Sequence, residues 1–333
     1  MNKSVSRRYF QKALLSVASL MAMGGWHMTT YAAEDKLKVV ASFSILADMV
    51  AEIGGDDVDV SVIVGRGADA HGFEPTPNDT RKLTHADVLF VNGLGFEAWL
   101  PRLVAASEFK GKEVVVSQGV QTLAFAGHAH DHGHEHEHEH EVHGGDAHEA
   151  THAHDHGSQD PHAWQDPANG VIYAKNIAEG LAAADPEDAA DYRARAQAYI
   201  AQIQDVDAET RQALKNIPEG NRTLVTSHDA FGYFSRAYGI RFLSAVGVSS
   251  QAEASARDVA QLIDQVKRDG IKAVFVENVT NPKVIEQIAR ETGARMGGTL
   301  YADSLASKEE PAGTYLGMLH WNATQIVQAL HAQ

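Results

Sequence analysis

Short apolar runs of strand length alternate along the chain with segments in which apolar residues recur every three or four positions. The apolar runs predict strands at 37–42, 58–64, 88–92, 113–116, 223–226, 242–246, 273–276 and near 299–301. The segments of helical period lie at about 46–53, 78–83, 96–105, 229–238, 256–268, 282–291 and 314–331. Strands that alternate with helices are typical of parallel sheets covered by helices, so the sequence predicts an α/β fold.

A charged, alanine-rich segment, 185–218, separates the two sets of predicted strands. It opens with the sequence DPE, and a proline in the first turn followed by an acid at the positive end of the dipole is typical of a helix start. A helix of about 28 residues would be about 40 Å long. We therefore expect two βα lobes with central parallel sheets, at 34–184 and 219–333, joined by one long rigid helix.

The first 32 residues have the pattern of a removable export signal. An apolar run at 13–25 follows four basic residues, namely Lys3, Arg7, Arg8 and Lys12. The paired arginines resemble the twin-arginine signal of proteins exported in the folded state, and the general secretory pathway is the alternative. Cleavage is expected after Ala32 or Ala33. No later apolar run reaches the roughly 18 residues of a membrane span, so we expect a soluble periplasmic protein after cleavage.

The composition limits the classes of partner. The chain carries 44 acidic and 28 basic residues, a formal net charge of −16. Such a surface repels nucleic acid and anionic lipid and attracts cations. The absence of cysteine excludes disulfides, thiolate metal sites and a lipid-acceptor cysteine at the cleavage point. We expect a monomer without a nucleic-acid partner.

One segment, 127–160, has little apolar character and cannot bury a core, so we expect a surface loop inserted in the first lobe. Of the chain's 19 histidines, it holds His128, His130, His132, His134, His136, His138, His140, His143, His148, His152, His154 and His156. Imidazoles interleaved with carboxylates bind Zn²⁺, Cu²⁺ and Ni²⁺. Because each captured ion must order the chain, these histidines predict auxiliary, weaker and exchangeable sites. A solvated linker without a role is the alternative.

Three histidines outside this loop lie in dense polar motifs. His71 lies in the sequence DAHGFEPTP, His162 in DPHAWQDP and His228 in TSHDAFGY. His71 and His228 follow predicted strands, and ligands of open α/β sheets bind beyond the carboxyl ends of the strands. Asp303, in the sequence YADSL, supplies a carboxylate that would complete a tetrahedron around zinc, and Glu277 is the rival fourth ligand.

These four motifs, in this order, resemble those of the zinc and manganese solute-binding proteins that serve ABC importers. The resemblance covers about 36–333 and implies a cleft between two lobes that holds one metal, with the three histidines and Asp303 as its ligands. It also implies the membrane permease of an ABC importer as a partner, and a zinc metallochaperone is a second candidate partner. Histidine at the third position together with a His-rich loop is the zinc-type pattern, whereas glutamate there accompanies manganese or iron. One departure is the sequence EAS at 253–255, where the family often has EPS.

The sequence therefore predicts a high-affinity periplasmic protein that captures Zn²⁺ and delivers it to an ABC importer. Four protein ligands fill the zinc shell, so we expect no enzymatic turnover. The alternatives are a manganese- or iron-binding homologue, a zinc buffer or adhesion protein, and a zinc hydrolase with Asp303 or Glu277 as base. Because ligating imidazoles must be unprotonated, affinity is expected to fall below about pH 6.5. His85 and His320 are expected to have ordinary roles.

Overall fold

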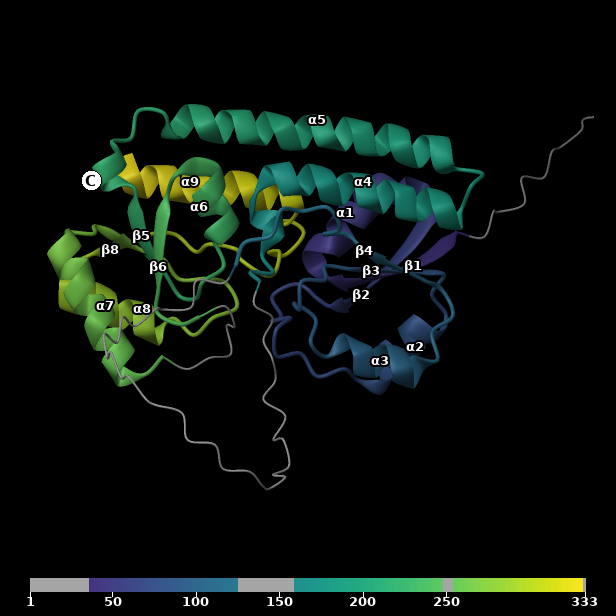
Figure 1. The fold of residues 1–333 in the computed structure, drawn as a ribbon, viewed down its shortest axis with the longest axis horizontal. Helices are drawn as coiled ribbons and strands as arrows, with labels where there is room; N and C mark the ends of the chain where they lie inside the picture. Colours follow the sequence, from purple (N-terminus) through teal and green to yellow (C-terminus); the bar gives the residue numbers. More distant parts are fainter. Residues whose placement is uncertain (1–35, 125–158, 248–253, 332–333) are drawn as a thin grey trace, which may run out of the picture. The chain divides into compact units, whose positions relative to one another are not determined.

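The structure, a computed structural model, describes residues 36–124, 159–247 and 254–331. Residues 36–333 form one compact unit. Two parallel sheets with covering helices lie in this unit, so the predicted fold class is confirmed (Figure 1). No helix within the described ranges is long and apolar enough to cross a membrane. The predicted export signal, 1–32, lies outside the described residues.

The first sheet has the strand order β2-β1-β3-β4, and each neighbouring pair is parallel. Its elements are β1 (Leu37–Phe43), α1 (Ser44–Gly54), η1 (Gly55–Asp57), β2 (Val58–Val64), α2 (Pro77–Thr84), β3 (Val88–Val91), α3 (Leu100–Ser107) and β4 (Lys112–Val115). All four residues of β3 are buried, as expected for a strand covered on both faces. The helix predicted at 96–105 begins later, at Leu100, because Pro101 lacks an amide hydrogen and fits only in a first turn.

The second sheet repeats the scheme in the order β6-β5-β7-β8. Its elements are η3 (Glu219–Asn221), β5 (Thr223–Thr226), α6 (Gly232–Tyr238), β6 (Arg241–Ser244), α7 (Ala256–Asp269), β7 (Ala273–Val274), α8 (Lys283–Thr292), β8 (Arg295–Met296) and α9 (Tyr315–His331). The last strand was predicted near 299–301, and that position is wrong, because only an isolated bridge from Leu300 to Glu277 forms there. Gly297 packs against the ring of Phe275, where a side chain would clash, and the regular ladder ends at this point.

The structure has the helix α4 (Pro167–Ala184) in a segment for which the sequence predicted no element. The carboxylate of Asp166 caps this helix by accepting a hydrogen bond from the amide of Ala168. The buried face of α4 spans more than half of the helix circumference and includes Asn169, Gly170 and Gly180, so the apolar pattern is weak. The short helix η2 (Ala163–Gln165) precedes it.

Two helices, α5 (Ala189–Leu214) and α9, pack in the hydrophobic cores of both halves of the molecule, each half being one sheet with its covering helices. The helix α5 is 26 residues long, which corresponds to about 40 Å, and it runs along α4 and α9 (Figure 1). Its residues Tyr192 and Ile203 pack in the core of the first half, and Leu214 packs in that of the second. The helix α9 also enters both cores, the first at Met318 and the second at Ile326.

Candidate metal site

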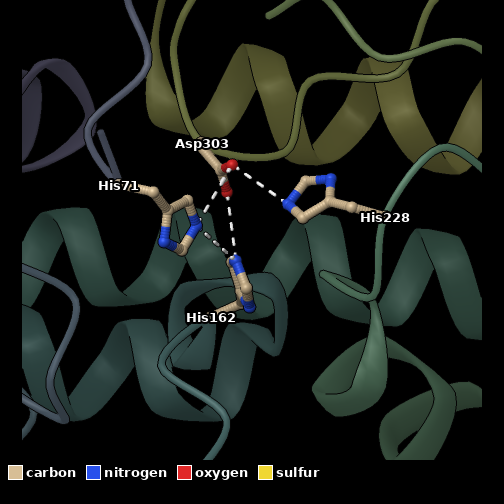
Figure 2. Close-up of side chains that lie close together, drawn as sticks. All are labelled: His71, His162, His228 and Asp303. Carbon is tan, nitrogen blue, oxygen red and sulfur yellow. Dashed lines mark hydrogen bonds and ion pairs between the residues drawn. The ribbon is translucent and has the colours of Figure 1, made fainter. Parts of the chain in front are cut away.

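The structure brings the four residues of the predicted site together from four separate segments. His71 lies in the loop after β2, His162 immediately before η2, and His228 directly after β5. Asp303 follows the bridge at Leu300. Figure 2 shows the carboxylate of Asp303 facing the three imidazole rings.

The ligand atoms have separations that suit a single small cation. One atom from each of the four residues lies within 4.8 Å of the other three. Oδ2 of Asp303 is 3.1 Å from Nε2 of His228 and 3.6 Å from Nε2 of His71. Oδ1 is 3.3 Å from Nε2 of His162, which is 3.2 Å from Nε2 of His71. Tetrahedral zinc, with bonds of about 2.0–2.2 Å, holds its ligand atoms about 3.3 Å apart.

Burial of these polar ligand atoms costs free energy unless a cation is bound. His162 and His228 are fully buried, and Asp303 is 1% exposed. Among the described residues, Nε2 of His228 and both carboxylate oxygens of Asp303 lack a hydrogen-bond partner of good geometry. A buried polar atom without such a partner costs about 1–3 kcal/mol. Coordination to a divalent cation would satisfy these atoms, so the donor set fits a metal.

Two further carboxylates orient two of the imidazoles. Oδ1 of Asp160 accepts from the amide of His162 at 2.9 Å and lies 2.8 Å from its Nδ1. Oε1 of Glu277 accepts from the amides of Ser227 and His228, and its Oε2 contacts Nδ1 of His228. A carboxylate at Nδ1 directs the lone pair of Nε2 toward the centre of the site. Glu277, the rival fourth ligand, thus lies at the opposite nitrogen of the ring from Asp303.

The carboxylates also govern the proton affinity of the site. Burial by itself would lower the pKa of His162, but the charges of Asp303 and Asp160 raise it to about 9. Burial would likewise lower the pKa of His228, but the charges of Glu277 and Asp303 raise it. Burial would raise the pKa of Asp303, and the two imidazoles instead lower it. Proton competition therefore extends above the pH of about 6.5 expected from free imidazole.

Aromatic side chains line the site. The ring of His71 meets that of Phe96 edge-on, with centroids 4.8 Å apart, and the ring of His162 meets that of Trp164 at 5.4 Å. Phe96 and Trp164 are buried, so they exclude water from one side of the site. Sequence reasoning assigned no role to Phe96 or Asp160, although Asp160 lies two residues before His162 in the quoted motif.

Two of the remaining histidines, His85 and His320, lie outside the cluster. His85 forms the C-terminal cap of α2, and His320 lies 3.8 Å from Glu209 with its side chain 66% exposed. Neither belongs to the group of four around Asp303. The twelve histidines of the predicted auxiliary loop, between His128 and His156, lie outside the described residues.

Comparison with known proteins assigns the chain to a family. The chain matches the model of the family described as ZnuA, zinc-uptake complex component A, periplasmic, over residues 39–329. It is 34% identical over 324 residues to the iron ABC transporter substrate-binding lipoprotein MtsA of Streptococcus pyogenes, covering 96% of each chain. It is 31% identical over 303 residues to the manganese ABC transporter substrate-binding lipoprotein PsaA of Streptococcus pneumoniae, covering 89% of this chain and 90% of PsaA. The structure of the periplasmic zinc-binding protein TroA of Treponema pallidum is similar, with a TM-score of 0.75, 29% identity, and coverage of 89% of this chain and 99% of TroA.

Proposed function

The chain belongs to the family of periplasmic zinc-uptake complex component A, and from this premise we propose that it captures Zn²⁺ with high affinity and delivers it to an ABC importer. In this proposal the ligands are His71, His162, His228 and Asp303. The observation that carries it is the buried cluster of three imidazoles and one carboxylate within 4.8 Å of one another.

Family membership establishes the class of protein. The chain is the substrate-binding component of an ABC importer for divalent metal ions, and it acts with a membrane permease and an ATPase. The family consists of solute-binding components and not of enzymes, so the zinc hydrolase is excluded. The family description supports a periplasmic location. The segment boundaries, a zinc metallochaperone as partner and the monomeric state stay predictions.

The choice of zinc over manganese is supported by the donor atoms. Imidazole suits Zn²⁺, whereas carboxylate, carbonyl and water oxygens suit Mn²⁺. Three nitrogens and one carboxylate therefore favour zinc, and four ligands match its tetrahedral preference. Since MtsA and PsaA are named for iron and manganese, these metals are the rival cargoes.

The deciding experiment is metal analysis of the purified protein, followed by competition titrations with a zinc chelator. We expect one tightly bound Zn²⁺ per chain at the buried site and its loss in His228→Ala. His320→Ala is the matched control, because His320 is an exposed imidazole outside the cluster, and it should bind like the wild type. Displacement of zinc by equimolar Mn²⁺, or tight zinc binding by His228→Ala, would contradict the proposal.

We propose in addition that the His-rich loop collects zinc for the buried site. The described residues on either side of it support this idea, because Ala124 and Gln159 pair as a bridge and the amide of Asp160 donates to the carbonyl of Leu123 at 2.9 Å. The described residues on both sides of the loop therefore lie near His162, because Gln159 is three residues before it and Ala124 pairs with Gln159.

Deleting residues 128–156 tests the role of this loop. The deletion should leave the single tight affinity intact but lower the zinc stoichiometry or the rate of transfer to the site. A variant of full length with the twelve histidines replaced by serine separates the loss of imidazoles from the loss of chain. Unchanged stoichiometry and transfer rate in both variants would disprove the collector role.

A further inference from the structure

The segment that carries Asp303 is held on both sides by residues from the first half of the chain. Before Asp303, the carbonyl of Ala302 accepts hydrogen bonds from Trp164 Nε1 at 2.8 Å and Gln165 Nε2 at 2.9 Å. After it, the hydroxyl of Ser304 accepts from the amide of Gly67 at 2.7 Å. Contacts from the first half of the chain therefore help to position the carboxylate, together with the hydrogen bond that Asn278 donates to the carbonyl of Ser304 at 3.1 Å.

Arg66 extends this attachment beyond Ser304. Its Nη1 donates to the carbonyl oxygens of Ala306 at 2.8 Å and Gly313 at 2.5 Å, and its Nη2 lies 3.7 Å from Oδ1 of Asp48. The other oxygen of Asp48 accepts from the amide of Tyr315 at 2.7 Å. We name this group, Arg66 with Asp48 and the carbonyls of Ala306 and Gly313, the Arg66 clasp.

The clasp joins two segments that each carry a proposed ligand. Arg66 lies five residues before His71 in the loop after β2, and the carbonyls that it binds belong to the segment after Asp303. The guanidinium is planar and presents several donors in a fixed geometry, which lets one side chain bind two carbonyls and a carboxylate. Its side chain is 25% exposed and that of Asp48 is 9% exposed, so water screens these contacts only in part.

We propose that Arg66 is a positioning residue that holds Asp303 against the metal and thereby slows metal release. This inference rests on the proposed metal-binding function. Opening the clasp would free the segment after Asp303 to move away from His71, while His162 and His228 keep the carboxylates that orient them. Arg66 therefore acts on the dissociation rate of the metal and leaves the association rate unchanged.

The chain offers a matched control for this residue. Arg195 donates to the carbonyls of Ile53 at 2.7 Å and Gly54 at 2.9 Å and pairs with Asp57 at 2.7 Å. It makes the same kinds of contact as Arg66, with a side chain 31% exposed, but none of its partners lies in a segment that carries a proposed ligand. Arg66→Lys and Arg195→Lys therefore remove comparable contacts at different distances from Asp303.

The experiment measures Zn²⁺ dissociation from the full chain by stopped flow with an excess of chelator. Arg66→Lys should release zinc about tenfold faster at an unchanged association rate, because a single ammonium group cannot make the contacts that both terminal nitrogens of the guanidinium make. Asp48→Asn, which weakens the clasp and spares Arg66, should accelerate release by a smaller factor. Arg195→Lys should behave like the wild type. Wild-type release rates in both clasp variants would overturn the proposal.

A double-mutant cycle separates positioning from general stabilisation. In the Asp303→Ala background, Arg66→Lys should leave the dissociation constant for zinc unchanged, because the carboxylate that it positions is absent. An equal effect of Arg66→Lys in both backgrounds would overturn the proposal. Failure of the wild type to hold zinc would instead contradict the proposed cargo, and the same comparison would then be decided with Mn²⁺.

Discussion

Replacing Asp303 by alanine removes one of four proposed ligands and also removes a charge that affects two of the others. Apparent zinc affinities of four-ligand sites correspond to about 10–16 kcal/mol, so one ligand contributes roughly 2.5–4 kcal/mol. Such a loss weakens binding by about a hundredfold to a thousandfold. This is the expected effect of Asp303→Ala when protons do not compete with the metal.

At neutral pH the loss should be smaller. The carboxylates of Asp303 and Asp160 raise the pKa of His162 to about 9, although burial opposes the rise. Below that pH the imidazole is protonated, so zinc must displace a proton, which costs about 3 kcal/mol at pH 7. Asp303→Ala relieves part of this competition, while Asp160 maintains the rest. The net loss of affinity should therefore fall toward about tenfold at pH 7.

The assay is chelator competition at pH 7 and pH 9, with the same two conditions for the wild type. Wild-type affinity should rise with pH between these values, because deprotonation of the imidazoles favours the metal. The affinity ratio of wild type to Asp303→Ala should be larger at pH 9 than at pH 7. Equal ratios at both values would refute the electrostatic part of the reasoning, and no loss at pH 9 would refute Asp303 as a ligand.

Three other substitutions test separate parts of the structure. His228→Glu exchanges an imidazole for a carboxylate, so the affinity for Mn²⁺ relative to Zn²⁺ should rise at least about tenfold in competition titrations, and an unchanged ratio would contradict the assignment. Burial lowers the pKa of His228, and the charge of Glu277, which Glu277→Gln removes, raises it. The variant should therefore release fewer protons when it binds zinc at pH 7, which a pH indicator measures. An unaltered proton count would argue against this role of Glu277. Tyr173→Phe removes a buried hydrogen bond to Oδ1 of Asn92 and should lower the free energy of unfolding by about 1–2 kcal/mol in urea titrations, whereas wild-type stability would show that the bond contributes nothing.

Local sequence determined most of the secondary structure. The strands at Val58–Val64 and Thr223–Thr226 have the predicted bounds, because short β-branched runs flanked by polar residues leave few alternatives. The helix α4 escaped prediction because its buried face spans more than half of the helix circumference, which weakens the one-sided apolar pattern. The last strand was misplaced because Gly297 packs against the ring of Phe275, the residue after β7, a contact that no local pattern encodes.

Part of the candidate site could also be predicted from the sequence. Parallel strands direct the loops that follow them to one edge of a sheet, so the strand-end positions of His71 and His228 predicted that these two residues lie on that edge. The residues themselves left Asp303 and Glu277 as rival fourth ligands, and the full set with His162 and Asp303 was what the resemblance to the zinc and manganese solute-binding proteins implied. Donor type is a property of the residue itself, so the preference for a borderline metal could be read from the sequence as well.

Only the tertiary structure decided how those ligands are held and how strongly protons compete for them. The carboxylates of Asp160 and Glu277 contact the outer nitrogens of two rings, and the Arg66 clasp holds the segment that follows Asp303. These contacts depend on angles and on burial between segments far apart in the chain. Sequence spacing therefore predicts which groups meet, but the orientation and electrostatic environment of each group arise only when the surrounding side chains pack.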